Sequence, residues 1–237
     1  MKTFLRCTVL LALLAMAVPG SAVEIKYAFK RGYSYNYTYK QQSSARATAF
    51  TTAANRSHTV PATNFSIKTI DFQDGAFILD IGNKDATFRR YVKANGDIKG
   101  APAETWQNNP FFLVFPDGDW KISGTHQTQK NLVFGGRSIP AAWNLLLKSV
   151  DTEKGTAEIL FSANLKLPDD RLRQKTFSLK GRLIFNLLEG VIHQADWQTI
   201  YTFNFANKEF AVTRNLWGFT RQIDHSLIMT GIEEQSQ

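Results

Sequence analysis

Large apolar side chains alternate with polar ones along most of the chain, a pattern typical of strands with one buried face. It is clearest in residues 33–39, where a tyrosine occupies every second position. The alternation returns in residues 175–229. We therefore expect long antiparallel strands, and we interpret the tyrosine row as a buried sheet face rather than a stacking platform for sugar rings.

Two stretches share one layout, in which a strand, a polar turn closed by glycine and a second strand follow one another. They are residues 67–81, with Gly75, and residues 147–161, with Gly155. Their second strands are in phase, and since strand side chains alternate between faces, both keep the same face buried. The matching positions are Phe77, Leu79 and Ile81 in the first copy, and Ala157, Ile159 and Phe161 in the second. We interpret the pair as a duplicated hairpin.

Other landmarks recur in the same order. The spacing Phe-x-x-Gly precedes a polar-alternating strand at residues 29–32 and again at 115–118, and turns follow at Gly96 and Gly190. We therefore expect an all-β protein whose long antiparallel strands form two similar units in a curved sheet, half-barrel or sandwich. The predicted units, which share one core, are residues 23–114 and 115–237.

Three stretches are less regular. Residues 41–64 are rich in small polar side chains and predict either a long polar hairpin or a mobile loop. Residues 106–115 form a non-periodic apolar patch; we expect it to be buried, whereas an exposed patch would be a binding surface. Good helix formers follow Pro140, so we expect a helical turn before Trp143.

The N-terminus has the layout of a secretory signal peptide. Lys2 and Arg6 precede an apolar run at residues 7–18, and small residues close it at 19–22. The run is shorter than the roughly 20 residues that a spanning helix needs. We expect residues 1–22 to be removed. Cys7, the single cysteine, lies within them, and a cysteine-free exported chain favours a bacterial periplasmic or secreted location.

The formal net charge of +8 falls to +6 without residues 1–22. A basic exported protein is expected to meet anionic lipids, lipopolysaccharide or acidic glycans rather than nucleic acid. One run of basic residues contains no acidic residue between its first and last members. It predicts a strand face that binds phosphate or carboxylate groups; the alternative is a charged sheet edge that resists aggregation. Its members are Arg171, Arg173, Lys175, Lys180 and Arg182.

No motif for metal, cofactor or catalysis stands out. The four histidines have no ligand spacing, and the chain has neither a Gly-x-Ser-x-Gly elbow nor a glycine-rich phosphate loop. We expect no metal, no cofactor and no enzymatic activity; a glycan-active enzyme, with a pair of carboxylates, is the weakest hypothesis. The available carboxylates are Asp169, Asp170, Glu189, Asp196 and Glu209.

Alternating aromatic strands are also typical of outer-membrane barrels. The stretch at residues 203–219, however, carries Lys208, Glu209 and Arg214, and the chain ends in a polar tail. We therefore expect a mature chain that does not span a membrane.

The order of these landmarks resembles a group of exported bacterial β-proteins built from two half-units. It is carried by the Phe-x-x-Gly openings, the Ile-Asp…Gly hairpin, Pro-Asp-Gly-Asp-Trp at 116–120 and Gly-Arg-Leu…Glu-Gly-Val-Ile at 181–192. The first opening departs from the pattern, because Tyr33 follows Gly32 where an Asp is expected. The order is more distantly similar to lipoprotein carriers of the LolA/LolB type. That resemblance implies a curved half-barrel that holds acyl chains.

The leading hypothesis is a periplasmic, non-enzymatic protein that binds an amphiphilic or cell-envelope ligand on a concave, aromatic-lined sheet. The alternative is a scaffold or assembly protein of the envelope that contacts another protein through its sheet edges or through residues 106–115. The candidate ligand-binding residues are Tyr33, Tyr35, Tyr37, Trp106, Phe111, Phe112, Arg171, Arg173 and Lys175.

Overall fold

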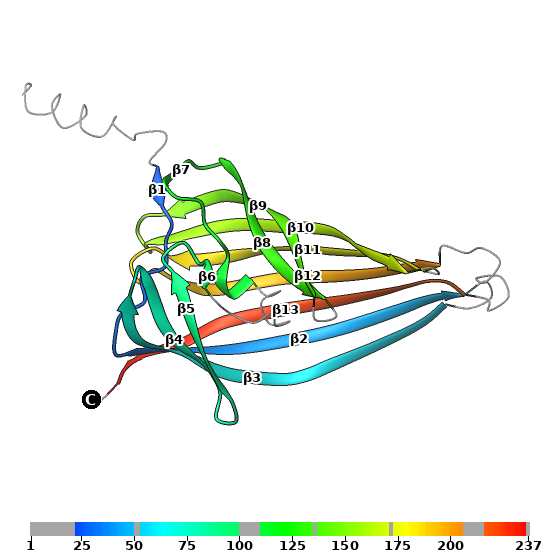
Figure 1. Cartoon of the computed structure of the whole chain (residues 1–237), viewed down its shortest axis with the longest axis horizontal. Coiled ribbons are helices and arrows are strands. Elements are labelled where there is room, and N and C mark those ends of the chain that lie inside the picture. The colour runs from blue at the N-terminus through cyan, green and yellow to red at the C-terminus, as the bar shows by residue number, and fades with distance from the viewer. Residues whose placement is uncertain are drawn as a thin grey trace, which may run out of the picture.

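A computed structural model gives the fold of the chain (Figure 1). It describes residues 22–49, 53–99, 110–134, 137–170, 173–205 and 216–235. The predicted signal peptide, apart from Ala22, lies outside the described residues, as do the candidate site residues Trp106 and Arg171.

Apart from one 3-10 turn at Pro110–Phe112, every element of the described residues is a strand. No helix in this part of the chain is long and apolar enough to cross a membrane. The strands are β1 (Val23–Glu24), β2 (Tyr33–Ala49), β3 (Ala53–Gln73), β4 (Ala76–Gly82), β5 (Thr87–Lys93), β6 (Ile98–Lys99), β7 (Asp119–Trp120), β8 (Thr125–Phe134), β9 (Arg137–Asp151), β10 (Thr156–Asp170), β11 (Arg173–Asn186), β12 (Val191–Phe205) and β13 (Leu216–Glu234).

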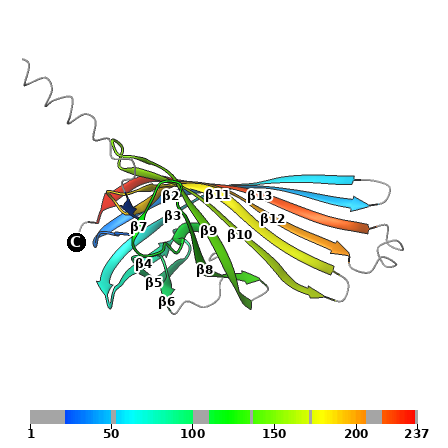
Figure 2. The same cartoon turned by 90° about the horizontal axis from the view of Figure 1, so that it is seen from above.

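Eleven of the strands form one antiparallel sheet in the order β6-β5-β4-β3-β2-β13-β12-β11-β10-β9-β8, and β1 pairs with β7 apart from it. The C-terminal strand β13 lies between β2 and β12 and so joins the two ends of the sequence. The sheet curves into an open trough (Figures 1 and 2). The prediction of an all-β, curved antiparallel sheet is confirmed.

The two ends of the trough differ. At the proximal end, which carries β1 and β7, two segments fill the concave face, and we call residues 25–29 and 110–120 the plug. Strands β2, β3 and β10 to β13 continue past the plug to the distal end, where they fan out (Figure 2). The ring of Tyr27 lies at the centre of the plug, with Phe115 5.3 Å and Phe185 of β11 5.5 Å from it between ring centroids.

Both predicted hairpins are present. Asp74 and Gly75 join β3 to β4 with φ values of 51° and 72°, a turn whose twist matches that of the paired strands. The β9–β10 turn is longer and also ends on a glycine of positive φ, Gly155. The second strands bury matching faces, with Leu79 and Ile159 both fully buried. Common ancestry of the two hairpins stays a prediction.

Two expectations about local structure are wrong, and one alternative is decided. The expected helical turn before Trp143 is strand β9; Pro140 lies beyond the residues of β9 that pair with β10, so its missing N–H interrupts no ladder on that side. The basic run is not at a sheet edge, because β11 lies between β10 and β12. The described parts of residues 41–64 form the long β2–β3 hairpin rather than a loop.

Candidate functional site: an apolar cavity in the trough

A cavity of about 300 Å³ opens on the concave face of the sheet, between strands β2 to β5 and the plug. Its wall is mainly aromatic and aliphatic, and it draws on both the sheet and the 3-10 turn of the plug. The lining residues are Tyr39, Thr63, Phe65, Ile81, Gly82, Asn83, Ala86, Phe88, Arg90 and Phe111. Sites for small molecules are typically concave and mostly apolar with a few polar groups, and this cavity has that character.

Strand pairing explains why these side chains meet. Ile81 of β4 pairs with Ile67 of β3 on one side and with Phe88 of β5 on the other, so their side chains share the concave face. Phe88 is 47% exposed and forms the mouth of the cavity, while Phe65 lies deeper.

The tip of the β4–β5 hairpin folds back to form one wall. The side-chain oxygen of Asn83 accepts hydrogen bonds from the backbone N–H groups of Asp85 (2.9 Å) and Ala86 (3.1 Å). The Asn83 N–H donates to the Ala86 carbonyl at 3.0 Å. Glycine is needed at position 82, because a side chain there would collide with the backbone of Ala86. The wall is therefore held in place by the backbone itself.

Arg90 brings a positive charge to the cavity wall. The side chain is buried, its guanidinium carbon lies 5.4 Å from the ring centroid of Phe88, and Nη1 donates to the Arg89 carbonyl at 2.7 Å. Arginine keeps its charge in protein environments and suits carboxylate and phosphate groups. An apolar cavity with a cationic wall fits an amphiphile whose polar end is anionic.

A cluster of rings lies where the plug meets the sheet. Three of its rings, those of Tyr39, Phe65 and Phe111, line the cavity, whereas Trp197 and His225 pack behind them and line a separate hollow of about 680 Å³. Phe111 stands edge-on to Tyr39 (6.1 Å, 85°) and to Trp197 (6.0 Å, 89°), and its centroid is 5.3 Å from that of Phe65. His225 stacks on Trp197 with centroids 4.7 Å apart and planes 6° apart. We call Tyr39, Phe65, Phe111, Trp197 and His225 the floor cluster.

Hydrogen bonds fix the polar groups of the floor cluster. The Tyr39 hydroxyl donates to Gln41 Oε1 at 3.0 Å and lies 2.6 Å from His225 Nδ1, while His225 Nε2 lies 3.1 Å from Thr199 Oγ1. In the neutral ring one nitrogen donates and the other accepts, so His225 donates a hydrogen bond to one of these two hydroxyls and accepts one from the other. Burial lowers the pKa of His225 to about 4, so the ring is neutral near pH 7.

The plug is tied down through tyrosine hydroxyls. Tyr27 Oη accepts a hydrogen bond from the Leu113 N–H at 3.1 Å and donates to the Phe111 carbonyl at 3.3 Å. Burial raises the pKa of this hydroxyl well above its ordinary value. Tyr27 therefore positions the turn that places Phe111 in the cavity wall.

The structure places the predicted site residues in different environments. Tyr35 and Tyr37 are buried, and their hydroxyls bond the Lys30 N–H (2.9 Å) and the Ile192 carbonyl (3.0 Å). Tyr33 is half-buried at the start of β2, and Phe112 is buried in the plug.

Of the predicted residues, Phe111 lines the cavity. Lys175 lies further along the trough, on the same face as Phe177 and apart from the outward-facing Lys180 and Arg182. Arg173 begins β11, and its side chain lies outside the described residues. A ligand-binding role for any of them stays a prediction.

Sequence reasoning missed Ile81, Phe88 and Arg90 as residues that line the cavity, and it missed His225 as the residue that packs behind Tyr39. Strand side chains alternate between faces in residues 77–81 and again in 88–92, on the two sides of the β4–β5 turn. This pattern could have placed Phe88 and Arg90 on the same sheet face as Ile81 and Leu79. Nothing in the sequence predicts that β13 pairs with β2, which is what brings His225 to Tyr39.

Of the carboxylates considered for glycan chemistry, the two with described side chains, Glu189 and Asp196, each face a basic side chain. Glu189 forms an ion pair with Lys30 at 2.7 Å, and Asp196 lies on the outer face near Arg182 at 3.4 Å. The side chains of Asp169 and Asp170 lie outside the described residues, as does Glu209. Within the described part of the chain, no group of three or more potential metal ligands occurs.

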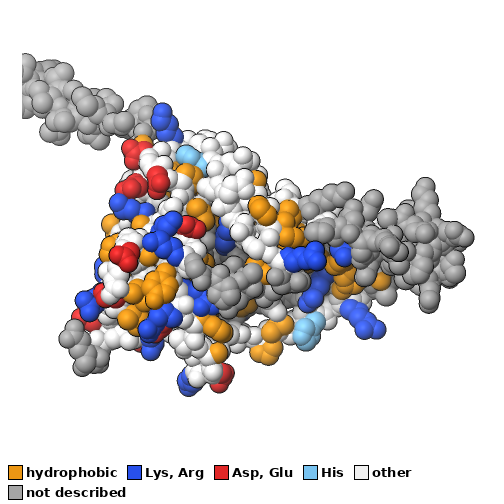
Figure 3. All heavy atoms as spheres, viewed as in Figure 1, with side chains coloured by type: hydrophobic (Ala, Val, Ile, Leu, Met, Phe, Trp, Pro, Cys, Tyr) orange, Lys and Arg blue, Asp and Glu red, His pale blue; other side chains and the backbone are white. Residues whose placement is uncertain are grey.

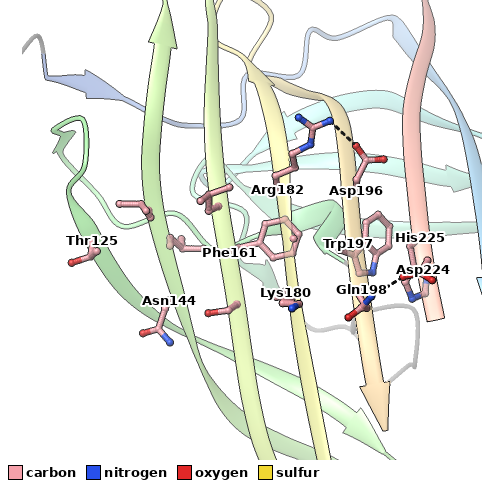
Figure 4. Close-up of a pocket in the computed structure, with 15 residues that line it drawn as sticks. Thr125, Asn144, Phe161, Lys180, Arg182, Asp196, Trp197, Gln198, Asp224 and His225 are labelled. Atoms are coloured by element: carbon pink, nitrogen blue, oxygen red, sulfur yellow. Dashed lines mark hydrogen bonds and ion pairs between the residues drawn. The ribbon is translucent and has the colours of Figure 1, made fainter. Parts of the chain in front are cut away.

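Three larger hollows lie on the outer face of the described strands; the smallest of them, of about 490 Å³, lies beside Glu158 and His193, and the following two are larger still. One, of about 680 Å³, crosses strands β8 to β13 (Figure 4), and Gly181 is among its lining residues. Its walls carry polar pairs such as Arg182 with Asp196 and Gln198 with Asp224, the latter at 2.9 Å. The other, of about 1080 Å³, lies beside Asn64 and the β4–β5 turn. Polar side chains supply much of the surface of the hollow beside Asn64, whereas the surface of the hollow across β8 to β13 is mainly apolar. The cavity in the trough is more enclosed than either of these two hollows, so an apolar chain is removed from water more completely there and the cavity is the better candidate for an amphiphile.

No protein-family model matches the chain, and no curated protein sequence matches it. A solved structure described as lipid–protein interactions in lipovitellin is similar to it, with a TM-score of 0.55 and 13% sequence identity. The match covers 89% of this chain and 26% of that one, so the chain spans about a quarter of the lipovitellin chain. At this identity the likeness concerns the fold alone. The resemblances to two-unit exported proteins and to LolA/LolB carriers stay predictions.

Proposed function

We propose that the protein binds a lipid or similar amphiphile, with the apolar part of the ligand in the cavity of the trough. One observation carries the proposal: an apolar, aromatic-lined cavity opens on the concave face beside a buried cation, Arg90. The similarity in fold to lipovitellin, a protein described by its lipid interactions, supports it.

The cavity suits one narrow apolar chain. Its volume of about 300 Å³ lies at the lower end of the roughly 300–1,000 Å³ common for small-molecule sites. An acyl chain that enters past Phe88 is removed from water. Each buried CH₂ group makes the free energy of binding more favourable by about 0.8 kcal/mol. An anionic head group would lie near Arg90, where a charge-assisted hydrogen bond is stronger than a neutral one.

The proposed setting is outside the cytoplasm. The layout of residues 1–22 supports export, and the absence of cysteine from residues 23–237 supports a bacterial periplasm. In that setting the amphiphile would come from the cell envelope, and lipopolysaccharide belongs to the same chemical class of anionic, acylated molecules.

A fluorescent fatty acid such as cis-parinaric acid tests the proposal, because its emission rises in an apolar site. We expect saturable binding that Ala86→Trp weakens at least tenfold, since a large ring at this lining position fills the mouth of the cavity. Thr87→Trp is the matched control: Thr87 is the neighbouring residue but lines the outer hollow, so binding should persist.

Equal loss in both variants, or no saturable binding by the wild type, would refute the proposed site. Native mass spectrometry of the purified protein adds a second reading. A co-purifying lipid supports the proposal, whereas a co-purifying polypeptide would favour the scaffold hypothesis.

A further inference from the structure

Charge is distributed unevenly along the trough. The distal half, which we define as residues 42–49, 53–59, 162–170, 173–180, 198–205 and 216–224, contains seven lysines and arginines against three aspartates. The remaining described residues contain sixteen lysines and arginines against fifteen acids. On the face shown in Figure 3, acidic and basic side chains mix at the proximal end, whereas basic side chains without acidic ones appear toward the distal end.

Three arginines form a corner of the distal half. Arg56 of β3 pairs with Ala45 of β2, Ala45 pairs with Arg221 of β13, and Arg46 is the next residue along β2. All three side chains are exposed. The described ion pairs lie elsewhere, as between Arg31 and Asp71, and none involves this corner.

The charge within the corner is therefore not neutralised by the described part of the protein. Asp224 is the acidic side chain that the structure describes in the distal half. It accepts hydrogen bonds from Gln198 and Gln222 on the outer face.

Aromatic side chains lie beside Arg221 on the concave face, which Arg56 shares, whereas Arg46, one residue on from Ala45, points to the outer face of the same end of the sheet. Arg221 pairs with Tyr201, and the next pair toward the strand ends is Phe203 with Phe219, whose ring centroids are 5.9 Å apart. These three rings are only partly buried. Cations next to partly exposed rings are typical of surfaces that rest in the headgroup region of a bilayer, where rings enter the interface and cations meet phosphates.

We infer that the distal end of the sheet docks on a membrane surface that contains anionic lipids. Lys and Arg near such a surface contribute on the order of a fivefold gain in binding each, so three of them together contribute on the order of a hundredfold. The trough runs from this end toward the cavity, so docking would present its concave face to the bilayer. The inference does not require the proposed ligand site, and the two can fail separately.

Co-sedimentation with vesicles tests the inference. We expect the protein to bind vesicles of phosphatidylglycerol and phosphatidylcholine in equal parts but not vesicles of phosphatidylcholine alone. Binding should weaken as salt shortens the Debye length from about 10 Å at 0.1 M toward 3 Å at 1 M. The triple variant Arg46→Gln, Arg56→Gln, Arg221→Gln should bind about a hundredfold more weakly.

The matched control removes three exposed charges from the proximal end, with Lys26→Gln, Arg31→Gln and Lys154→Gln. It has the same net charge as the first variant and should keep wild-type binding. Arginine-to-lysine changes at the three distal positions should also keep binding, which excludes a loss caused by misfolding. Binding of cis-parinaric acid without vesicles should be the same in both triple variants.

Equal losses in the distal and proximal variants would overturn the inference, because net charge alone would then explain binding. Failure of the wild-type protein to bind anionic vesicles would also overturn the inference. This holds even if the protein binds a soluble polyanion such as dextran sulfate. Loss of cis-parinaric acid binding with retained vesicle binding would refute the proposed ligand site and leave the docking surface standing.

Discussion

The Nδ1 atom of His225 lies 2.6 Å from the hydroxyl oxygen of Tyr39, although 186 residues separate them in the sequence. The contact exists because the last strand, β13, pairs with β2. It places a neutral imidazole, stacked on Trp197, behind Tyr39, which lines the cavity. This relationship links the pairing of β13 with β2 to one wall of the proposed site.

Acidification is expected to destabilise the protein through His225. Burial lowers the pKa of His225 from 6.5 to about 4. Between these two values the imidazole is protonated in the unfolded chain but neutral in the folded chain, so protons favour the unfolded chain. The free energy of unfolding should therefore fall as pH drops from about 6.5 to 4, by on the order of 3 kcal/mol in total, and level off below that range.

Urea unfolding at several pH values checks this prediction. The variant His225→Gln removes the titrating group, so the pH dependence between 6.5 and 4 should be flatter in the variant whatever its absolute stability. Parallel curves for the wild type and His225→Gln would show that other groups cause the acid sensitivity.

Removal of one hydroxyl from the plug should loosen the cavity floor. Tyr27→Phe leaves the buried Leu113 N–H without its 3.1 Å acceptor, a loss of about 1–3 kcal/mol in the free energy of unfolding. Tyr91→Phe, an exposed tyrosine on the outer face of β5, should cost less than about 0.5 kcal/mol. Hydrogen exchange at Leu113 should quicken in the first variant; unchanged exchange there would mean that Tyr27 does not hold the plug.

Gly181 is expected to be intolerant of any side chain. An added Cβ would meet the Asp196 carbonyl, the side chain of Trp197 and the ring of Phe161, so Gly181→Ala should cost about 1–3 kcal/mol and shift the tryptophan emission. A Cβ at Gly231 meets no atom within 4 Å, so Gly231→Ala serves as the control. Thermal unfolding compares the two, and equal midpoints would show that the rings beside Gly181 can move aside.

The sequence predicts local structure well where a periodic pattern and a turn signal coincide. The hairpin around Asp74 and Gly75 has both, since apolar residues alternate on either side of a turn that needs positive φ. The tyrosine row likewise predicts a buried face, and Tyr35 and Tyr37 are buried.

The cavity could not be predicted, because pairing between distant strands creates it. Alternation predicts that Phe65 and Phe111 avoid water but not that they meet, since Phe111 belongs to a plug without strand periodicity. The same limit applies to charge. Lys175 and Lys180 lie on opposite faces of β11, and only the register of the strand decides which of them faces the trough.

Photolabelling with a fatty acid that carries a diazirine on its acyl chain tests the central claim most directly. We predict saturable adducts, mapped by mass spectrometry, on peptides that contain Phe65, Phe88 or Phe111, all of which line the cavity. Excess unlabelled fatty acid should abolish them. Saturable labelling confined to Leu146 and Leu160, in the hollow on the outer face, would contradict the account.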